Sequence, residues 1–207
     1  MRLSRHGEEQ MGEGALFVIS APSGAGKSTL IERIRPLFPN MLYSVSCTTR
    51  RPRNGEVQGR HYYFLDREVF ESMVKQGEFL EWKEVHGNLY GTPSEPVKRA
   101  LKEGRCVILD IDVQGAQDVF AGIPQAVGIF ITVADLATLE ERLRRRGSDT
   151  EESIRTRMSN APEELAQEGK FHYVIVNEQV DEAVVELASI IARECEKRGL
   201  RGVGDLS

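Results

Sequence analysis

Short apolar runs alternate with longer amphipathic stretches along most of the chain. Runs such as Leu16 to Ser20 have the length of buried strands, whereas the stretches between the runs repeat apolar residues with a helical period. The pattern predicts strands at residues 16–20, 105–109, 126–133 and 173–176, and helices that begin at residue 27, after 112, at 136 and at 181, the last ending near 197. This alternation predicts an α/β fold with a parallel sheet covered by helices.

An aromatic and glycine-rich segment interrupts the alternation between Met41 and Gly91. We interpret it as a mixed, strand-rich lobe, residues 41–93, inserted in the α/β core. The first residues, 1–13, are polar and lack apolar periodicity, which predicts a mobile N-terminal tail that contains Met11 as an alternative start. The interpretation gives one domain at residues 14–193, with its core built from residues 14–40, 94–146 and 171–198.

A second insertion, residues 147–170, is polar and helical in character. Ser148 and Glu151 have the spacing of a capping box, which predicts the start of a helix at this point. Pro162, which follows Asn160 by two residues, is expected to interrupt that helix, because proline suits a first helical turn but not an interior.

Composition narrows the class of protein. The 207 residues are 40% apolar, enough for one core, and contain no run long enough for a membrane span or a signal sequence. A cytoplasmic protein is therefore expected. Cys47, Cys106 and Cys195 are far apart and lack metal-ligand spacing, which argues against a disulfide framework or a zinc site. The net charge of −5 argues against a general nucleic-acid binder.

A phosphate-binding loop is predicted directly after the first strand. Small residues there allow successive backbone N–H groups to converge on phosphate oxygens, and the following helix adds its positive end. Lys27 would reach the β- and γ-phosphates and the Ser28 hydroxyl a magnesium ion, although Ala21 stands where the strict pattern has glycine. The ATP-binding set is Ala21, Pro22, Ser23, Gly24, Ala25, Gly26, Lys27, Ser28 and Thr29. Size and the two insertions favour a small-molecule kinase over a motor or a switch.

Further motifs lie in the first insertion and at the strand ends. They are the segments 21–30, 44–56, 87–92, 109–115, 146–147 and 174–177. In these motifs, their order and their spacing, the chain resembles the guanylate kinases from about Gly14 to Arg193. The resemblance implies a P-loop NTPase core of three layers, a GMP-binding lobe and a helical lid. It also implies transfer of the γ-phosphate of Mg-ATP to GMP, and to dGMP, in guanine nucleotide synthesis and recycling.

The resemblance also assigns roles to single residues. It implies that Arg50, Arg53, Tyr62 and Tyr90 hold the GMP phosphate, that Ser46, Glu81, Thr92 and Asp112 surround the guanine, and that Asn177 approaches the ATP base. Paired guanidinium groups match phosphate geometry, and a carboxylate with a hydroxyl matches the guanine edge while repelling the adenine ring nitrogen. Asp110 follows an apolar run at the carboxyl end of a strand, where ligands of such folds bind, and is expected near the magnesium ion or its waters.

The arginines between residues 140 and 160 divide by their helical spacing. Glu140 precedes Arg144 by four residues, as Glu141 precedes Arg145 and Glu151 precedes Arg155, so we expect surface ion pairs for those three arginines. Arg142, Arg146 and Arg157 lack such an acid, and the resemblance places the same three near the transferring phosphates.

The predicted chemistry is an in-line attack of a GMP phosphate oxygen on the γ-phosphorus, stabilised by Lys27, magnesium and the lid arginines without a protein nucleophile. Two alternatives stay open. One is a kinase for another nucleoside monophosphate. The other is a guanylate-kinase-like interaction module without catalysis, although such modules typically lack a workable phosphate loop and this chain has Gly24, Gly26, Lys27 and Ser28.

Overall fold

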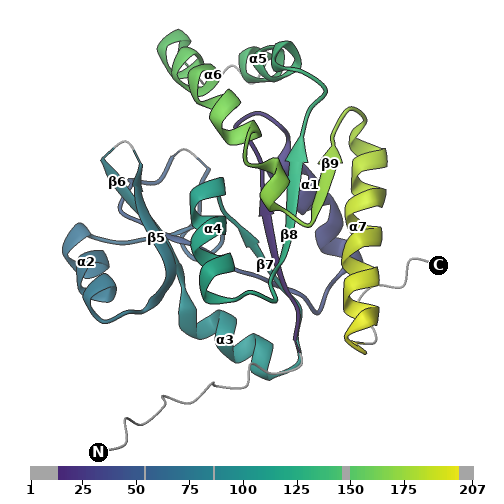
Figure 1. Ribbon diagram of the computed structural model, residues 1–207. Helices are drawn as coiled ribbons and strands as arrows, with labels where there is room; N and C mark the ends of the chain where they lie inside the picture. The colour runs from purple at the N-terminus through teal and green to yellow at the C-terminus, as the bar shows by residue number, and fades with distance from the viewer. Residues whose placement is uncertain (1–13, 54, 86, 146–149, 201–207) are drawn as a thin grey trace, which may run out of the picture.

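The computed structural model describes residues 14–200 except 54, 86 and 146–149. Its centre is a parallel sheet in the order β2, β7, β1, β8, β9 (Figure 1). These strands span Leu42–Tyr43, Val107–Asp110, Leu16–Ser20, Val127–Thr132 and Tyr173–Val176, in that order. The predicted strands of the core are thus present, with ends shifted by at most two residues.

Alternation along β1 divides the core between the two faces of the sheet. Phe17 and Ile19 pack with α1 and α7, while Leu16 and Val18 pack with α3 and α4. These helices span Lys27–Ile34, Val180–Lys197, Ser94–Lys102 and Val113–Gly122, in that order. Helices thus cover both faces of the sheet, because a buried parallel strand must bury its side chains on both sides.

The first insertion forms a second sheet, in the order β4, β3, β6, β5. These strands span Tyr63–Phe64, Cys47–Thr48, Asn88–Pro93 and Phe79–Val85. Helix α2, Arg67–Lys75, packs on β5 through Phe70, whose ring stacks on Phe79 at a centroid distance of 4.5 Å. Figure 1 shows this part beside the parallel sheet. Within the range expected for the inserted lobe, β2 instead pairs with β7 in the core sheet.

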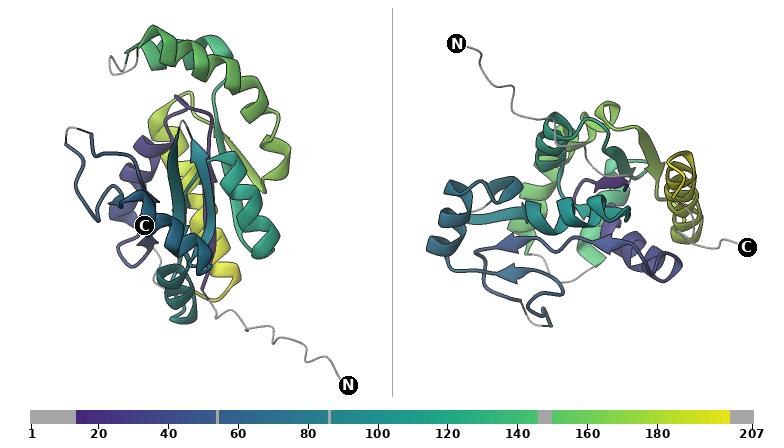
Figure 2. Two further views of the ribbon diagram at one scale, coloured as in Figure 1. Left: turned by 90° about the vertical axis from the view of Figure 1, so that its left-hand side faces the viewer. Right: turned by 90° about the horizontal axis from the view of Figure 1, so that it is seen from below.

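Two helices follow β8 on the side of the sheet where the parallel strands end. Helix α5 spans Leu136–Arg145 and α6 spans Glu151–Leu165. Figure 2 shows them lying over the carboxyl ends of the strands, with α6 descending towards α4. Short 3₁₀ segments at Arg35–Leu37 and Glu168–Lys170 complete the secondary structure of the described residues.

Two expectations about the second insertion are wrong. Pro162 lies inside α6 and does not break it; the proline is three residues before the end of the helix. The capping residue is Thr150, whose hydroxyl accepts a hydrogen bond from the Ser153 amide at 3.2 Å. Glu151 is therefore the first helical residue and not the fourth position of a capping box, while Ser148 lies outside the described residues.

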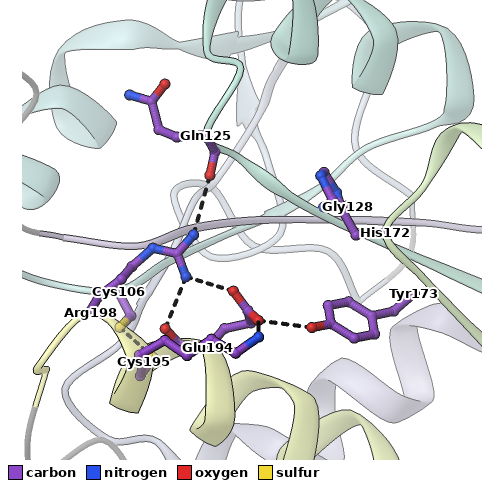
Figure 3. A network of polar contacts seen from close by, with 9 residues as sticks. Cys106, Gln125, Gly128, His172, Tyr173, Glu194, Cys195 and Arg198 are labelled. Atoms are coloured by element: carbon purple, nitrogen blue, oxygen red, sulfur yellow. Dashed lines mark hydrogen bonds and ion pairs between the residues drawn. The ribbon is translucent and has the colours of Figure 1, made fainter.

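The end of α7 is fixed by a buried carboxylate. Glu194 accepts hydrogen bonds from the Tyr173 hydroxyl at 2.8 Å, from Lys197 at 2.6 Å and from Arg198 at 2.7 Å (Figure 3). Beside it the buried thiols of Cys106 and Cys195 lie 2.9 Å apart between their sulfur atoms. The Tyr173 hydrogen bond joins β9 to α7, and the Cys106–Cys195 contact joins the residue before β7 to the same helix.

Candidate active site

The phosphate-binding loop connects β1 to α1. Gly24 and Gly26 have φ angles of 96° and 93°, a region that glycine enters without the steric cost of a side chain. At Gly26 a second reason applies, because a Cβ atom would lie 2.4 Å from the Asn177 amide nitrogen. The Ala25 amide donates to the Pro22 carbonyl at 3.1 Å, which tightens the loop before the helix begins.

Two side chains from other elements hold this loop. The Asn177 amide, fully buried after β9, donates to the Ala25 carbonyl at 2.7 Å. Arg142 of α5 donates to the Asn177 carbonyl at 2.7 Å and to the Ala25 carbonyl at 3.4 Å. Both therefore support the backbone of the loop, and their direct roles towards ATP stay predictions.

Lys27 and Asp110 meet at the carboxyl ends of β1 and β7. The Lys27 ammonium lies 2.7 Å from Asp110 Oδ1 and donates to the Ile111 carbonyl at 2.7 Å. Ser28 lines the same cavity. Among the described residues, no group of three or more histidine, cysteine, aspartate or glutamate side chains could hold a metal ion by itself.

Helix α6 also contacts the phosphate loop, at Ser23. Arg157 donates to the Ser23 hydroxyl, and the Ser23 amide donates to Glu164 Oε2 at 3.3 Å. Burial raises the pKa of Glu164 above its usual value. The second insertion is therefore joined to the loop at both Arg157 and Glu164, the latter a residue for which the sequence suggested no role.

A cavity of about 320 Å³ lies between the phosphate loop and the second sheet. A neighbouring cavity of about 310 Å³ shares Ser28, Ser46, Tyr62 and Asp110 with it. The first cavity is lined by Lys27, Ser28, Ser46, Tyr62, Glu81, Lys83, Val85, Tyr90, Gly91, Asp110, Ile111 and Asp112. Tertiary structure thus brings predicted ATP-side and predicted GMP-side residues to one space.

Glu81 is the most buried carboxylate of this cavity, with 6% of its surface exposed. Its Oε1 accepts a hydrogen bond from the buried Thr92 hydroxyl at 2.6 Å. On the side of Oε2 lies Gly115 of α4, where an added Cβ would come within 2.7 Å. Burial raises the pKa of Glu81, although the Thr92 hydrogen bond opposes that shift. The carboxylate is therefore held in one orientation.

Asp112 and Lys83 form an ion pair across the cavity. Asp112 caps α4, where its Oδ1 accepts from the Gly115 amide at 3.0 Å. Lys83 comes from β5, and burial lowers its pKa to about 8. The sequence analysis assigned no role to Lys83, although its position two residues after Glu81 gives both side chains the same face of the strand.

Arg50 lines neither cavity, but its partner Glu56 lines the second one. Its guanidinium binds both oxygens of Glu56, at 2.8 and 2.9 Å, and lies 5.5 Å from the centre of the Tyr62 ring. The Arg50 hydrogen bond lowers the pKa of Glu56 to about 2. Arg53 is exposed and donates its backbone amide to Glu56 at 2.6 Å. Glu56 thus organises the arginine segment, a function that the sequence did not suggest.

The expected ion pairs are confirmed only in part. Arg144 binds Glu140 at 2.9 Å, as its spacing indicated. Arg144 also binds Glu151. The ion pairs of the described residues include neither the expected Glu151–Arg155 nor the expected Glu141–Arg145 pair. Arg146 lies outside the described residues.

The parallel sheet and the glycine-rich loop that runs from β1 into α1 and ends in Lys27 and Ser28 define a P-loop nucleotide-binding protein. A family model described as guanylate kinase matches residues 13–194. The chain belongs to the guanylate kinase family.

Known relatives agree with this membership. The chain is 48% identical to a guanylate kinase of Carboxydothermus hydrogenoformans, over 89% of this chain and 90% of that relative. It is 44% identical to one of Desulfitobacterium hafniense, over 89% and 92%. The crystal structure of guanylate kinase from Anaplasma phagocytophilum matches with a TM-score of 0.70 at 35% identity, over 87% of this chain and 86% of that one. Of the helices described here, none has the length and apolar character to cross a membrane.

Proposed function

We propose that this chain transfers the γ-phosphate of ATP to GMP, giving ADP and GDP, and that dGMP is also an acceptor. One observation carries the proposal. A single cavity joins Lys27 and Ser28 of the phosphate loop to the buried carboxylate of Glu81 and to Asp112. If ATP binds at the first end and the guanine base of GMP at the second, the GMP phosphate would lie between them and face the γ-phosphate of ATP.

The donor half uses the phosphate loop. Backbone N–H groups of residues 21–29 and the N-terminus of α1 would bind the ATP phosphates. Lys27 would leave Asp110 for the β- and γ-phosphate oxygens, because the phosphates carry more charge than one carboxylate. Arg157 of α6 already reaches Ser23 of this loop, which supports a role for it, together with Arg142 and Arg146, at the transferring group.

Magnesium fits the donor chemistry of this site. The Ser28 hydroxyl and the Asp110 carboxylate line one cavity, and hard divalent cations prefer such oxygen ligands. Ser28 would hold the ion directly and Asp110 through water. When bound with ATP, magnesium would neutralise charge on the phosphate oxygens.

The acceptor half lies in the second sheet. Glu81, oriented by Thr92, would accept hydrogen bonds from the guanine N1–H and amine, with Ser46 and Asp112 beside it. Arg50, Arg53, Tyr62 and Tyr90 would hold the phosphate. On this proposal the GMP-binding lobe is the part of residues 41–93 that forms the second sheet and α2, while β2 belongs to the core. Residues 147–170 form the lid, residues 14–40, 94–146 and 171–198 form the rest of the core, and the enzyme works in the cytoplasm.

Catalysis then rests on position and charge. The two insertions would exclude water, so that a GMP phosphate oxygen and not a water molecule attacks the γ-phosphorus. Cationic groups aimed at the transferring oxygens lower the barrier most where water is absent.

The test is GDP formation by the purified protein with Mg-ATP and GMP. We expect GDP, much lower rates on AMP, UMP and dTMP, and a loss of roughly a thousandfold or more in Lys27→Ala. Lys98→Ala, an exposed lysine on α3, serves as the matched control and should keep the wild-type rate. Absence of GDP, or a faster rate on another monophosphate, would overturn the proposal.

A further inference from the structure

Lys83 lines the cavity, but it belongs to neither the predicted ATP-binding residues nor the predicted GMP-binding residues. Its side chain is only 18% exposed and extends from β5 towards α4, on the face that also carries Glu81. Trp82, which lies between Glu81 and Lys83 in the strand, is on the opposite face and is 46% exposed. A lysine loses hydration at such a position, so a compensating partner is required. In the structure that partner is Asp112.

The position of Lys83 in the sheet places it between the two ends of the acceptor. On the same strand, Glu81 lies at the proposed base end. On the neighbouring strand, Tyr90 is directly opposite Lys83, and Tyr90 interacts with Arg50 at the proposed phosphate end. Directly opposite residues in an antiparallel pair have their Cβ atoms about 5 Å apart. The stem of Lys83 therefore begins next to a phosphate-side tyrosine.

The balance of charged side chains in the cavity suggests what Lys83 does. Glu81, Asp110 and Asp112 contribute three carboxylates, against the two ammonium groups of Lys27 and Lys83. A nucleoside monophosphate brings about two further negative charges at neutral pH. Guanine N–H groups can satisfy carboxylates, but they add no positive charge. With GMP bound the carboxylates and the phosphate would outnumber the ammonium groups of the cavity, so a cation from β5 would stabilise the bound phosphate.

We propose that Lys83 is an acceptor-binding residue whose ammonium group exchanges Asp112 for the phosphate of GMP when GMP binds. This inference rests on the proposed function, since it takes GMP as the acceptor. The exchange frees Asp112 to accept a hydrogen bond from guanine at the same step. Base recognition and phosphate neutralisation are thereby coupled, and a ligand with only one of the two parts gains less.

The test compares GMP with guanosine, which has the base and ribose but no phosphate. Affinities are measured by calorimetry without ATP for the wild type and for Lys83→Met, which keeps the length of the side chain and removes the charge. We expect GMP binding to weaken about 10- to 100-fold, the size of one lost charge-assisted bond, and guanosine binding to change less than about threefold. Lys83→Arg should regain much of the GMP affinity, and Lys98→Met on exposed α3 should match the wild type.

A purely structural Lys83–Asp112 link predicts another result. Lys83→Met would then weaken GMP and guanosine by the same factor, or leave both unchanged, and either outcome would overturn the inference. Failure of the proposed function is separate, because it appears as absence of GDP formation in the wild type. A wild type that makes GDP together with equal losses in Lys83→Met would reject the role of Lys83 alone.

The pH dependence of GMP binding provides a second test of the role of Lys83. It becomes the deciding test when guanosine binds too weakly to measure. Burial lowers the pKa of Lys83 to about 8, so GMP affinity should fall as the pH rises from 7 to 9. The second ionisation of the phosphate, with a pKa of about 6, is about nine-tenths complete at pH 7 and changes little above it. The charged and titratable groups facing Lys83 are Glu81 on β5, Tyr90 on β6, Lys27 on α1, Asp112 and Asp118 on α4, and Glu164 on α6. Lys83→Met retains all of them, so a profile as steep as that of the wild type would contradict the role of Lys83.

Discussion

The Thr92 hydroxyl donates to Glu81 Oε1 at 2.6 Å, and both side chains are buried. Thr92 and Glu81 stand directly opposite each other on β6 and β5, so the sheet itself sets their distance. One carboxylate oxygen is thereby occupied. The other lies beside Gly115, at the end of α4 that Asp112 caps.

Replacing Glu81 by glutamine tests whether this carboxylate reads the base. Thr92 can still donate to the remaining carbonyl oxygen, so the new NH₂ group takes the place of Oε2 and faces the guanine donors. We expect kcat/KM for GMP to fall by a factor that corresponds to about 2 to 4 kcal/mol of activation free energy. ATP binding should be retained, and the ratio of kcat/KM for GMP to that for AMP should become smaller. Steady-state rates on GMP and AMP measure both effects. Glu84→Gln, on the exposed face of β5, is the control, and equal losses on GMP and AMP would assign specificity to Ser46 and Asp112 instead.

Gly115→Ala should separate stability from activity. Alanine favours a helix by up to about 1 kcal/mol over glycine, which offsets part of the cost of displacing the buried Glu81 side chain, so Tm should change little. The new Cβ would come within 2.7 Å of Glu81 Oε2, which must move, and GMP efficiency should fall at least about tenfold. Gly122→Ala, at the end of the same helix with no atom within 4 Å of the added Cβ, should keep full activity. An active Gly115→Ala protein would show that the orientation of Glu81 is not critical.

The arginines of the second insertion should differ in effect. Arg157 reaches the phosphate loop, whereas Arg144 forms exposed ion pairs with Glu140 and Glu151. We expect Arg157→Ala to lower kcat about 10- to 1000-fold and Arg144→Ala to change it less than about twofold, because exposed pairs contribute little. Rates at saturating ATP and GMP decide between them. Similar losses in the two variants would mean that contact with the loop does not identify the functional arginine.

Glu194→Gln tests stability at a distance from the cavity. Burial alone would raise the pKa of Glu194, but hydrogen bonds from Lys197, Arg198 and Tyr173 hold it at about 2 (Figure 3). Since the pKa is lower in the folded state, the stabilisation is full above the unfolded value near 4.5 and disappears as the pH falls towards 2. We expect the variant to lose about 1 to 3 kcal/mol in the free energy of unfolding at pH 7, by urea denaturation.

The difference between this variant and the wild type should narrow from pH 4.5 downwards. Glu196→Gln, exposed on the same helix, should stay within about 0.5 kcal/mol of the wild type. A difference that is constant with pH would indicate lost packing and not lost charge.

The sequence by itself determined the main strands of the core sheet and the position of the phosphate-binding loop. The apolar runs located β1, β8 and β9, and the glycine-rich loop before Lys27 identified phosphate binding, because strand burial and loop geometry depend on neighbouring residues. The same local reasoning failed at Pro162, which α6 accommodates in its last turn, and at Glu151, whose partner Arg144 comes from another helix. Spacing along one helix does not reveal a partner on the next.

Only the tertiary structure decided what surrounds each functional group. Lys83 looked like an ordinary strand residue until β5 was packed against α4, which buried it and paired it with Asp112. Asn177 and Arg142 similarly contact the Ala25 carbonyl of the phosphate loop only because β9 and α5 pack beside it. These contacts join residues that lie from 29 to 152 positions apart on different elements. Side-chain burial and pairing between elements follow from the packing of those elements and not from their periodicity.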